Sequence, residues 1–539
     1  MPSDPRKQSA VKLILPGVLL AVVTLLPFLN KAYTIDDPWF LLEARQIFKT
    51  PLEPMSFAIC WMGDETCISR AGRLGAGTRQ GLMGYLLLPT IFLGTAEWSA
   101  HLLQIGLACL AIAEMVRLSL LLGLDRRQAT VAGVLLAAIP PFLSMASTAM
   151  PDIAALALGL TGLERLLVWK EQRRWHQAMI ASLALGIAPY ARPPLALLIL
   201  LGGIWLWDEF NIRKSVTQFR RQAYLWAPIF GAICILISIN IMTRDRGPAS
   251  GAADILIRRG NILINLSAYF RYLSFPIPFT LVWLAAHWRK AKMLVVLPGI
   301  PILVAHFMVS PSSGLIHEWP LAAVLYGLTA LVDMVYQYLK SRDRIGILLS
   351  LWILGPLPAV IYMHFPIKYM LTILPAVVLT LIRLLSTLAK RRQALAYGAL
   401  IISCTAYSLV LLRADADFAD YGRRAAAELI APHVAAGEKV WYGGQWGFYW
   451  YAQEAGARIS KPGEPGPNPG ELLAVGLMEG GGATLNRFPN RELIDSRSYA
   501  SPHGRTMGYG AGLYSNSFGN ALWVWNPTST NVYQLWRVH

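Results

Sequence analysis

Charge is scarce in this chain, and acidic charge is scarcer than basic charge. Only 15% of the 539 residues are charged, whereas 55% are hydrophobic and the mean hydropathy is +0.45. This composition excludes a string of ordinary soluble domains, because apolar segments near the ~20 residues that a bilayer requires recur along the chain. The sequence therefore predicts a polytopic α-helical membrane protein.

The 48 Lys and Arg residues outnumber the 31 Asp and Glu residues, which gives a formal net charge of +17. These basic residues do not gather on one patch but lie in short clusters between apolar segments. Such a distribution is typical of loops that orient a protein in a membrane. We therefore expect the lipid bilayer as a partner and do not expect nucleic acid.

Two kinds of sequence pattern are absent. No His-Glu-x-x-His sequence occurs, which excludes the usual motif of a membrane metalloprotease. No internal repeat or low-complexity tract is found either, although transporters are often built from repeats. A polytopic transporter or lipid flippase is therefore kept as the alternative class and not as the first hypothesis.

Cysteine is also rare, with five residues in the chain. Cys109, Cys234 and Cys404 fall inside apolar segments, where a small buried residue is the ordinary interpretation. Cys60 and Cys67 flank a short polar turn in the first loop, and an outward-facing loop would permit a disulfide between them. Their spacing does not decide between that disulfide and two unpaired thiols.

The apolar segments divide the chain into expected membrane spans and polar connections. The piece 81–94 contains Gly84 and Pro89 and would reach about 21 Å as a helix, against a hydrocarbon core of ~30 Å. We expect an in-plane or re-entrant helix there, within a large first outer loop at 30–97. About 13 transmembrane helices are expected, at 13–29, 98–122, 128–147, 152–169, 175–190, 193–209, 222–243, 267–287, 292–309, 318–339, 345–363, 367–388 and 394–412.

The basic clusters predict how these spans are oriented. Connections on one side each hold a cluster of Lys and Arg, whereas the four short connections on the other side hold only Arg192 and Lys368. Because cytoplasmic loops carry the excess of Lys and Arg, the N-terminus is expected in the cytoplasm. The first span is expected to stay uncleaved, because no small-residue cleavage site follows it.

The composition changes after residue 412. Residues 1–412 are expected to form the membrane domain, and 413–539 a small soluble α/β domain on the extracytoplasmic side. A helix-like stretch to Val434, a strand at 439–442 and a second helix that ends near Gly456 support this prediction. Aromatic residues crowd the region from Trp441 to Tyr451, where they either stack on sugars or pack in a core.

Two adjacent carboxylates, Asp36 and Asp37, follow the first apolar segment and are expected at a membrane surface. The dipeptide Asp37-Pro38 fits an N-cap followed by proline at the first helical position, and apolar residues recur at helical spacing from Phe40. This pattern predicts an amphipathic helix on the bilayer. If Asp37 is the cap, Asp36 is left for chemistry; alternatively, both are solvated loop acids that only start a helix.

Several other polar residues are expected on the same outer face as this acid pair. Arg suits phosphate because its fork donates two hydrogen bonds, and a carboxylate suits deprotonation of an attacking hydroxyl or amine. Charged residues at a membrane boundary are functional candidates by default, although each one alone also fits an interfacial charge. The candidates are Asp36, Asp37, Arg79, Asp152, Arg192, Arg258, Arg259, Lys368 and Tyr369.

Five features occur in order on this expected face. They are the acid pair after the first span, Glu97-Trp98-Ser99-Ala100, Ala149-Met150-Pro151-Asp152, Tyr190-Ala191-Arg192-Pro193, and Lys368-Tyr369-Met370-Leu371-Thr372-Ile373-Leu374-Pro375. Together they resemble the GT-C glycosyltransferases, and most closely the protein O-mannosyltransferases and the bacterial transferase that adds aminoarabinose to lipid A. The resemblance covers residues 10 to about 412.

This resemblance implies an enzyme of the bacterial inner membrane that moves a hexosyl or pentosyl group, with inversion, from a polyprenyl-phosphate donor such as an undecaprenyl phosphate sugar. The acceptor is an extracytoplasmic lipid, glycan or protein. Asp36 matches the first acid of the family's pair and is implied as the general base, with Asp37 positioning or assisting it. Asp152 matches the acid of the second outer loop.

The resemblance also implies how the donor phosphate is bound. Arg192 stands where relatives carry Lys or Arg, and the further candidates are Arg79, Arg258, Arg259, Lys368 and Tyr369. Relatives often have Lys-Pro-Pro-Leu before the in-plane helix, whereas this chain has Thr78-Arg79-Gln80-Gly81-Leu82. The hairpin between Cys60 and Cys67 looks like an insertion that shapes acceptor access.

A divalent metal ion is used by some members of the wider class, and the sequence leaves this cofactor open. His317, Glu318 and His364 are expected on the outer face. Their spacing does not dictate a set of ligands, and a packed or interfacial histidine is the simpler interpretation.

Overall fold

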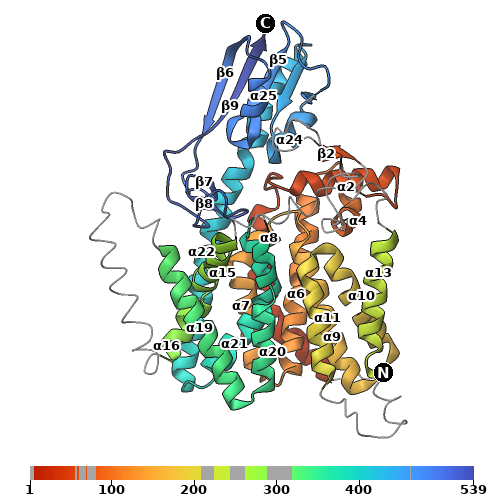
Figure 1. The fold of residues 1–539 in the computed structure, drawn as a ribbon, viewed down its shortest axis with the longest axis vertical. Coiled ribbons are helices and arrows are strands. Elements are labelled where there is room, and N and C mark those ends of the chain that lie inside the picture. Colours follow the sequence, from red (N-terminus) through yellow and green to blue (C-terminus); the bar gives the residue numbers. More distant parts are fainter. Residues whose placement is uncertain are drawn as a thin grey trace, which may run out of the picture.

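The computed structural model shows a bundle of long helices with a smaller part at one end that contains a β-sheet (Figure 1). The N-terminus lies at the end of the bundle that is far from the sheet, and the C-terminus lies beyond the sheet. The residues that the structure describes are 5–54, 57–59, 68–69, 81–207, 224–242, 262–287, 319–362, 364–461 and 463–539.

Within these ranges, five helical stretches are long and apolar enough to cross a membrane, or six if one bent pair of helices is a single span. The chain is therefore a multi-pass membrane protein. The expected total of 13 spans stays a prediction, because the expected span 292–309 lies outside the described residues. The five stretches are Val11–Phe28, Glu97–Leu121, Arg344–Ile361, Ile367–Leu385 and Lys390–Ala435.

The helices of the bundle follow the apolar runs of the sequence closely. The expected span 175–190, for example, forms α10 (Trp175–Ala191). The other helices of the bundle are α1 (Pro5–Leu25) with η1 (Leu26–Phe28), α6 (Glu97–Leu121), α7 (Arg126–Ala138), α8 (Pro140–Ala146), α9 (Asp152–Gln172), η2 (Pro193–Leu195), α11 (Ala196–Trp207), α13 (Ala227–Met242), α15 (Ile262–Ser274), α16 (Phe279–Ala286), α19 (Trp319–Ser341), α20 (Arg344–Leu354), η5 (Leu357–Ile361), η6 (Ile367–Ile373), α21 (Leu374–Leu385) and α22 (Lys390–Ala425).

Glycines allow some of these helices to approach one another closely. A Cβ atom added to Gly17 of α1 would lie 2.8 Å from the Ile112 side chain of α6 and 2.9 Å from the backbone of Gly133 in α7. A Cβ atom added to Gly133 would lie 2.6 Å from Val116. Membrane helices often pack through such small residues, because close backbone approach increases van der Waals contact.

Proline breaks two of the expected spans, and for these the prediction of one continuous helix is wrong. The segment 128–147 becomes α7 and α8, which meet at Pro140 with a bend of 61°. The segment 267–287 becomes α15 and α16, which are separated by a stretch that contains Pro276 and Pro278. Proline has no N–H to donate and its ring clashes with the preceding turn, so a helix ends or bends there.

The described part of the first outer loop lies across the sheet-bearing end of the bundle (Figure 1). Its longest helix is α2 (Asp37–Lys49), and the apolar piece 81–94 forms two five-residue helices, α4 (Leu82–Leu86) and α5 (Leu88–Phe92). The exposed Phe48 and Phe92 rings meet edge to face, with centroids 5.1 Å apart. Residues of β1 (Ala58–Ile59) and β2 (Ile68–Ser69) pair antiparallel in the same loop.

The helix α22 joins the bundle to the C-terminal part without interruption. Its 36 residues span about 54 Å, and η7 (Ala426–Ile430) and α23 (Ala431–Ala435) continue its course. The expected boundary near residue 412 thus falls inside one helix. How the chain divides into domains stays a prediction.

The C-terminal sheet has five strands in the order β4-β3-β5-β9-β6. The strand β3 pairs in parallel with β4 and β5, whereas β9 pairs antiparallel with β5 and β6. The elements of this region are β3 (Val440–Gly443), α24 (Trp446–Glu454), β4 (Arg458–Ile459), β5 (Leu472–Gly476), η8 (Leu477–Gly481), α25 (Gly482–Asn486), β6 (Arg491–Tyr499), β7 (Met507–Gly508), β8 (Ala511–Gly512) and β9 (Asn531–Val538).

The aromatic cluster of this region forms part of its core. Tyr442, Trp446, Phe448 and Trp450 are all at most 5% exposed. Of the two interpretations of this cluster, core packing is the one that describes these four side chains. Burial of large aromatic surfaces is a main source of stability in a small domain.

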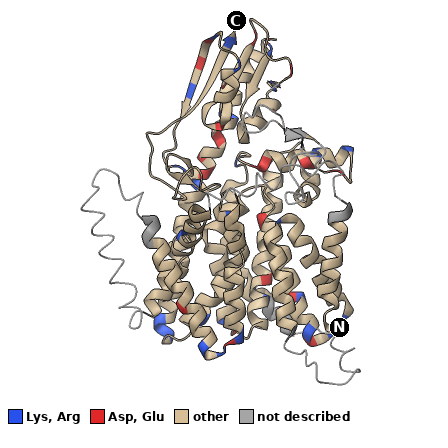
Figure 2. Ribbon diagram, in the orientation of Figure 1, with Lys and Arg blue, Asp and Glu red and all other residues tan. Residues whose placement is uncertain are grey.

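Figure 2 shows where the charged residues lie along the molecule. Most of the bundle is drawn in tan, and within the bundle Lys and Arg are concentrated at the end that is far from the C-terminal sheet, while the sheet region carries further Lys and Arg. Which end of the bundle faces the cytoplasm stays a prediction from the positive-inside rule.

Candidate active site

The segment that carries the acid pair turns sharply before α2 begins. Ile35 has a positive φ of 47°, and the Asp37 amide donates to the Thr34 carbonyl at 2.9 Å. Asp36 therefore occupies the N-cap position of α2, which the sequence assigned to Asp37, but its side chain makes no capping hydrogen bond. The prediction of the cap is off by one residue, and the Asp36 carboxylate is still left for other contacts.

The Asp37 carboxylate is buried and holds two backbone segments together. Its Oδ2 accepts from the Thr34 amide at 3.0 Å, and its Oδ1 accepts from the Ala149 amide at 2.8 Å. Burial raises the pKa of Asp37 to about 7, although the charge of Lys31 and the two backbone hydrogen bonds act in the opposite direction. A side chain with 0% exposure does not meet a substrate, so this geometry fits a positioning role.

The Asp36 carboxylate is partly exposed and contacts a lysine from a distant part of the chain. Its Oδ2 accepts from the Lys368 Nζ at 2.9 Å, and its side chain is 36% exposed. Burial acts to raise the pKa of Asp36, but the charge and hydrogen bond of Lys368 outweigh it and hold that pKa below its usual value. Asp36 is therefore an ionised, accessible acceptor for a proton.

Asp152 and Arg192 form a two-point ion pair beside this acid. The Arg192 Nε donates to Asp152 Oδ1 at 2.8 Å, and its Nη2 donates to Oδ2 at 2.6 Å. Asp152 opens α9 directly after Pro151, and Arg192 follows the last residue of α10, before Pro193, so the helix ends place both side chains at one level of the bundle. The carboxylate thereby fixes the plane of the guanidinium.

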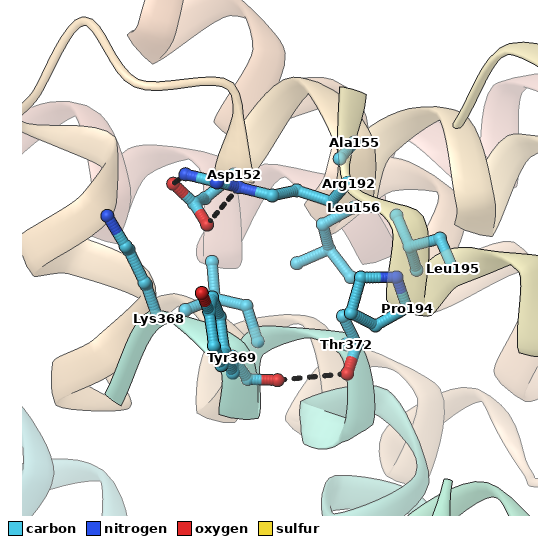
Figure 3. Close-up of a pocket in the computed structure, with 10 residues that line it drawn as sticks. Asp152, Ala155, Leu156, Arg192, Pro194, Leu195, Lys368, Tyr369 and Thr372 are labelled. Carbon is cyan, nitrogen blue, oxygen red and sulfur yellow. Dashed lines mark hydrogen bonds and ion pairs between the residues drawn. The ribbon is translucent and has the colours of Figure 1, made fainter. Parts of the chain in front are cut away.

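A small pocket connects these groups (Figure 3). The Asp152–Arg192 pair lies on one side of it, while Lys368 and Tyr369, from η6, lie on the other. Its free volume of about 10 Å³ is close to the room that one water molecule needs. It is lined by Asp152, Ala155, Leu156, Arg192, Pro194, Leu195, Lys368, Tyr369, Leu371 and Thr372.

The structure thus brings together five of the nine predicted site residues: Asp36, Asp152, Arg192, Lys368 and Tyr369. Asp37 lies behind them as a support. The other predicted residues, Arg79, Arg258 and Arg259, and the two cysteines of the expected disulfide, Cys60 and Cys67, lie outside the described residues. Their roles stay predictions.

The described residues do not form a metal site. Within the described ranges, no three His, Cys, Asp or Glu side chains gather as ligands. His364 packs edge to face with Tyr362, and burial, reinforced by the charge of Lys368, lowers the pKa of His364 to about 4. His317 and Glu318 lie outside the described residues, and the use of a metal ion stays open.

The sequence interpretation missed a second charged cluster behind the acid pair. Lys31, which is buried and follows η1 after Leu29 and Asn30, donates to Asp415 of α22 and to Ser147 at the end of α8. A lysine after an apolar run is usually a membrane anchor, and no local pattern distinguishes a buried one. Asp415, Asp417 and Asp420 lie at the start of the helix-like stretch that was predicted to reach Val434, and their spacing alone does not identify Lys31 as a partner.

Comparison with solved structures finds proteins of several kinds. One is the Saccharomyces cerevisiae protein O-mannosyltransferase Pmt1-Pmt2 complex bound to the sugar donor, with 12% identity, a TM-score of 0.33, and coverage of 48% of this chain but only 38% of that chain. Another is the oligosaccharyltransferase AglB from Archaeoglobus fulgidus, in complex with an inhibitory peptide and a dolichol-phosphate, with 13% identity, a TM-score of 0.46, and coverage of 88% and 70%.

ArnT from Cupriavidus metallidurans is similar over nearly the whole chain. The structure bound to undecaprenyl phosphate has 11% identity, a TM-score of 0.48 and coverage of 97% of both chains. The apo structure has 12% identity, a TM-score of 0.49 and coverage of 98% of both chains. All of these TM-scores lie below 0.5, and such low identity does not carry residue roles from one chain to another.

No protein-family model and no curated protein sequence matches the chain. The function must therefore be inferred from the residues themselves.

Proposed function

We propose that this protein is a glycosyltransferase that moves a sugar from a polyprenyl-phosphate donor to an extracytoplasmic acceptor. One observation carries the proposal: the accessible Asp36 carboxylate is hydrogen-bonded to Lys368, which also lines the pocket that contains Arg192. A proton acceptor and two cations around one small pocket match the needs of a reaction in which a hydroxyl attacks and a phosphate leaves.

The reaction is a single displacement. As the acceptor hydroxyl oxygen bonds to the anomeric carbon, its proton passes to the Asp36 carboxylate. The bond between that carbon and the phosphate oxygen breaks, and its electron pair leaves with the phosphate. Arg192 and Lys368 stabilise the growing negative charge, and attack from the face opposite the phosphate inverts the anomeric carbon.

The positions of the helix ends support this assignment of roles. Asp152 holds the guanidinium of Arg192 in one plane, which preorganises it for a phosphate oxygen. Lys368 lies between the acid and the pocket, so its charge acts on both the base and the leaving group. The protein would work at the outer face of the bacterial inner membrane, with the C-terminal region in the periplasm.

Sugar release from a labelled polyprenyl-phosphate donor pool tests this function. The Asp36→Ala variant should lose roughly 10²- to 10⁴-fold in turnover, which is the usual contribution of a general base, while it still binds undecaprenyl phosphate. Glu454→Gln, which removes a carboxylate charge exposed on the same side of the molecule, is the control and should keep full turnover. Undiminished turnover of Asp36→Ala would eliminate the base.

The same assay separates the enzyme from a transporter or lipid flippase. An enzyme breaks the bond between sugar and phosphate and leaves free polyprenyl phosphate. A transporter or flippase would move the intact lipid between leaflets and leave that bond whole.

A further inference from the structure

A buried ion pair links the start of the first outer loop to α22. The Lys31 Nζ lies 2.5 Å from Asp415 Oδ2, and the two side chains are 0% and 1% exposed. Lys31 also donates to the Ser147 carbonyl at 3.1 Å and to the Ser147 hydroxyl at 3.3 Å. Charges buried this deeply need complete pairing, because desolvation costs more than a single contact returns.

The Asp415 carboxylate has further partners in the C-terminal region. Its Oδ2 accepts from the Tyr514 hydroxyl at 2.6 Å, and its Oδ1 accepts from the Thr506 hydroxyl at 3.2 Å. Thr506 and Tyr514 flank the small hairpin of β7 and β8. One carboxylate therefore joins the first outer loop, α22 and the C-terminal region.

The ion pair is connected to the proposed base by two hydrogen bonds that join the segment 31–37 to the segment 147–149. At one end of the segment 31–37, Lys31 binds Ser147; at the other end, Asp37 binds the Ala149 amide. In the sequence, Asp36 lies between Lys31 and Asp37, the two residues that make these hydrogen bonds. The segment that begins at Ser147 continues to Asp152, so the same two hydrogen bonds also help to fix the position of Asp36 relative to the Asp152–Arg192 pair.

We propose that Asp415 is a positioning residue that acts through Lys31 to hold Asp36 at its place beside the pocket. Tyr514 and Thr506 extend this support, so the C-terminal region sets the geometry of the membrane site. The proposal rests on the function proposed above. A pair of apolar side chains would fill the same space without the cost of burying charges, but an apolar residue at position 31 would not donate to the Ser147 carbonyl.

Replacing the buried ion pair by two apolar side chains tests the proposal. Lys31→Met combined with Asp415→Leu in the full chain removes both charges together, and such replacements of buried ion pairs are often neutral or stabilising. We expect this double variant to keep its apparent melting temperature and to bind undecaprenyl phosphate within about twofold of the parent. Turnover of the labelled donor pool at saturation should fall about tenfold or more, because small displacements of catalytic groups are costly.

The kcat and KM values distinguish positioning from mere stability. A loss in kcat with unchanged donor KM supports the proposal, whereas a stable double variant with full kcat overturns it. Tyr514→Phe keeps the ion pair and the ring and removes only one hydroxyl; it should lower kcat about threefold with no change in KM. If the double variant does not fold, an unchanged kcat of Tyr514→Phe overturns the proposal, and a lowered kcat supports it.

Asp36→Ala is measured in parallel, so that two different failures can be told apart. If Asp36→Ala retains full turnover, the proposed function has the wrong base. If Asp36→Ala is inactive while the double variant is fully active, only the role of Asp415 is wrong.

Discussion

The Asp36 carboxylate accepts a hydrogen bond from the Lys368 ammonium at 2.9 Å, although 332 positions separate the two residues in the chain. This contact joins the start of α2 to the 3₁₀ turn η6. It gives the proposed base a cation that keeps it ionised and places that cation at the wall of the pocket.

Replacing Lys368 should change how turnover depends on pH. Because Lys368 lowers the pKa of Asp36, Lys368→Met should raise that pKa. The base would then be protonated at a higher pH, so the acidic limb of the kcat profile should move toward neutral pH. Lys368→Arg keeps the charge and should leave the limb in place. Identical limbs for Lys368→Met and the parent would show that Lys368 does not act on the base.

Arg192→Lys should weaken donor binding more than acceptor binding. A lysine keeps the charge, but it does not reproduce the two-point contact of the guanidinium with Asp152. The loss of one charge-assisted hydrogen bond costs about 1.5–3 kcal/mol, which corresponds to at least about tenfold in affinity for undecaprenyl phosphate. Arg45→Lys, at an exposed ion pair with Glu454, is the matched control. Equal donor affinity in both variants would contradict a phosphate role for Arg192.

The contribution of Asp37 to stability should fall as pH rises. The folded protein keeps a proton on Asp37 up to about pH 7, whereas an unfolded aspartate releases it near ~4. Between these values unfolding releases a proton, so the free energy of unfolding decreases with rising pH by up to ~1.4 kcal/mol per unit. The apparent melting temperature, measured from pH 5 to pH 8, should therefore fall less in Asp37→Asn than in the parent.

Other groups also titrate between pH 5 and pH 8. Their contributions to the melting temperature cancel when the parent is compared with Asp37→Asn. Burial raises the pKa of Glu479 to about 8, for example, and its ionisation gives a slope of the same sign in both proteins. Parallel curves for the parent and the variant would mean that Asp37 is ionised throughout.

Cysteine labelling should test the orientation of the membrane domain. In a chain whose five native cysteines are replaced by serine, Ala96→Cys at the start of α6 should react with an impermeant maleimide from outside intact cells. Arg173→Cys, in the turn between α9 and α10, should react only after the membrane is opened. The reverse pattern would overturn the topology and the periplasmic location of the site.

The sequence predicted the positions of the membrane helices well, because the length of an apolar run indicates where a helix begins and ends. The expected 175–190 and the observed α10 agree to within a residue. The breaks in 128–147 and 267–287 were missed, because hydropathy does not register the N–H that a proline lacks. The course of α22 was predicted as two separate helical segments, the span 394–412 and the helix-like stretch to Val434, because the change from apolar to polar composition near residue 412 does not show that the helix continues.

The candidate site was predictable in part. Orientation rules and the family resemblance placed Asp36, Asp152, Arg192 and Lys368 on one face, and the structure brings them together. Pairings between distant residues were not predictable, since hydropathy says which side a residue faces but not what it contacts. The Lys31–Asp415 pair is such a case, because its two members lie 384 positions apart.

The unbroken course of α22 has a consequence for how this chain tolerates insertions. Each residue added to an α-helix rotates everything beyond it by about 100° and advances it by about 1.5 Å. An extra residue in the stretch that precedes Asp415 would rotate the C-terminal sheet around the axis of α22, whereas a loop at that place would absorb the change. The length of α22 is therefore constrained by the rotation that it sets for the C-terminal sheet, and the amino-acid composition of the helix does not reveal this constraint.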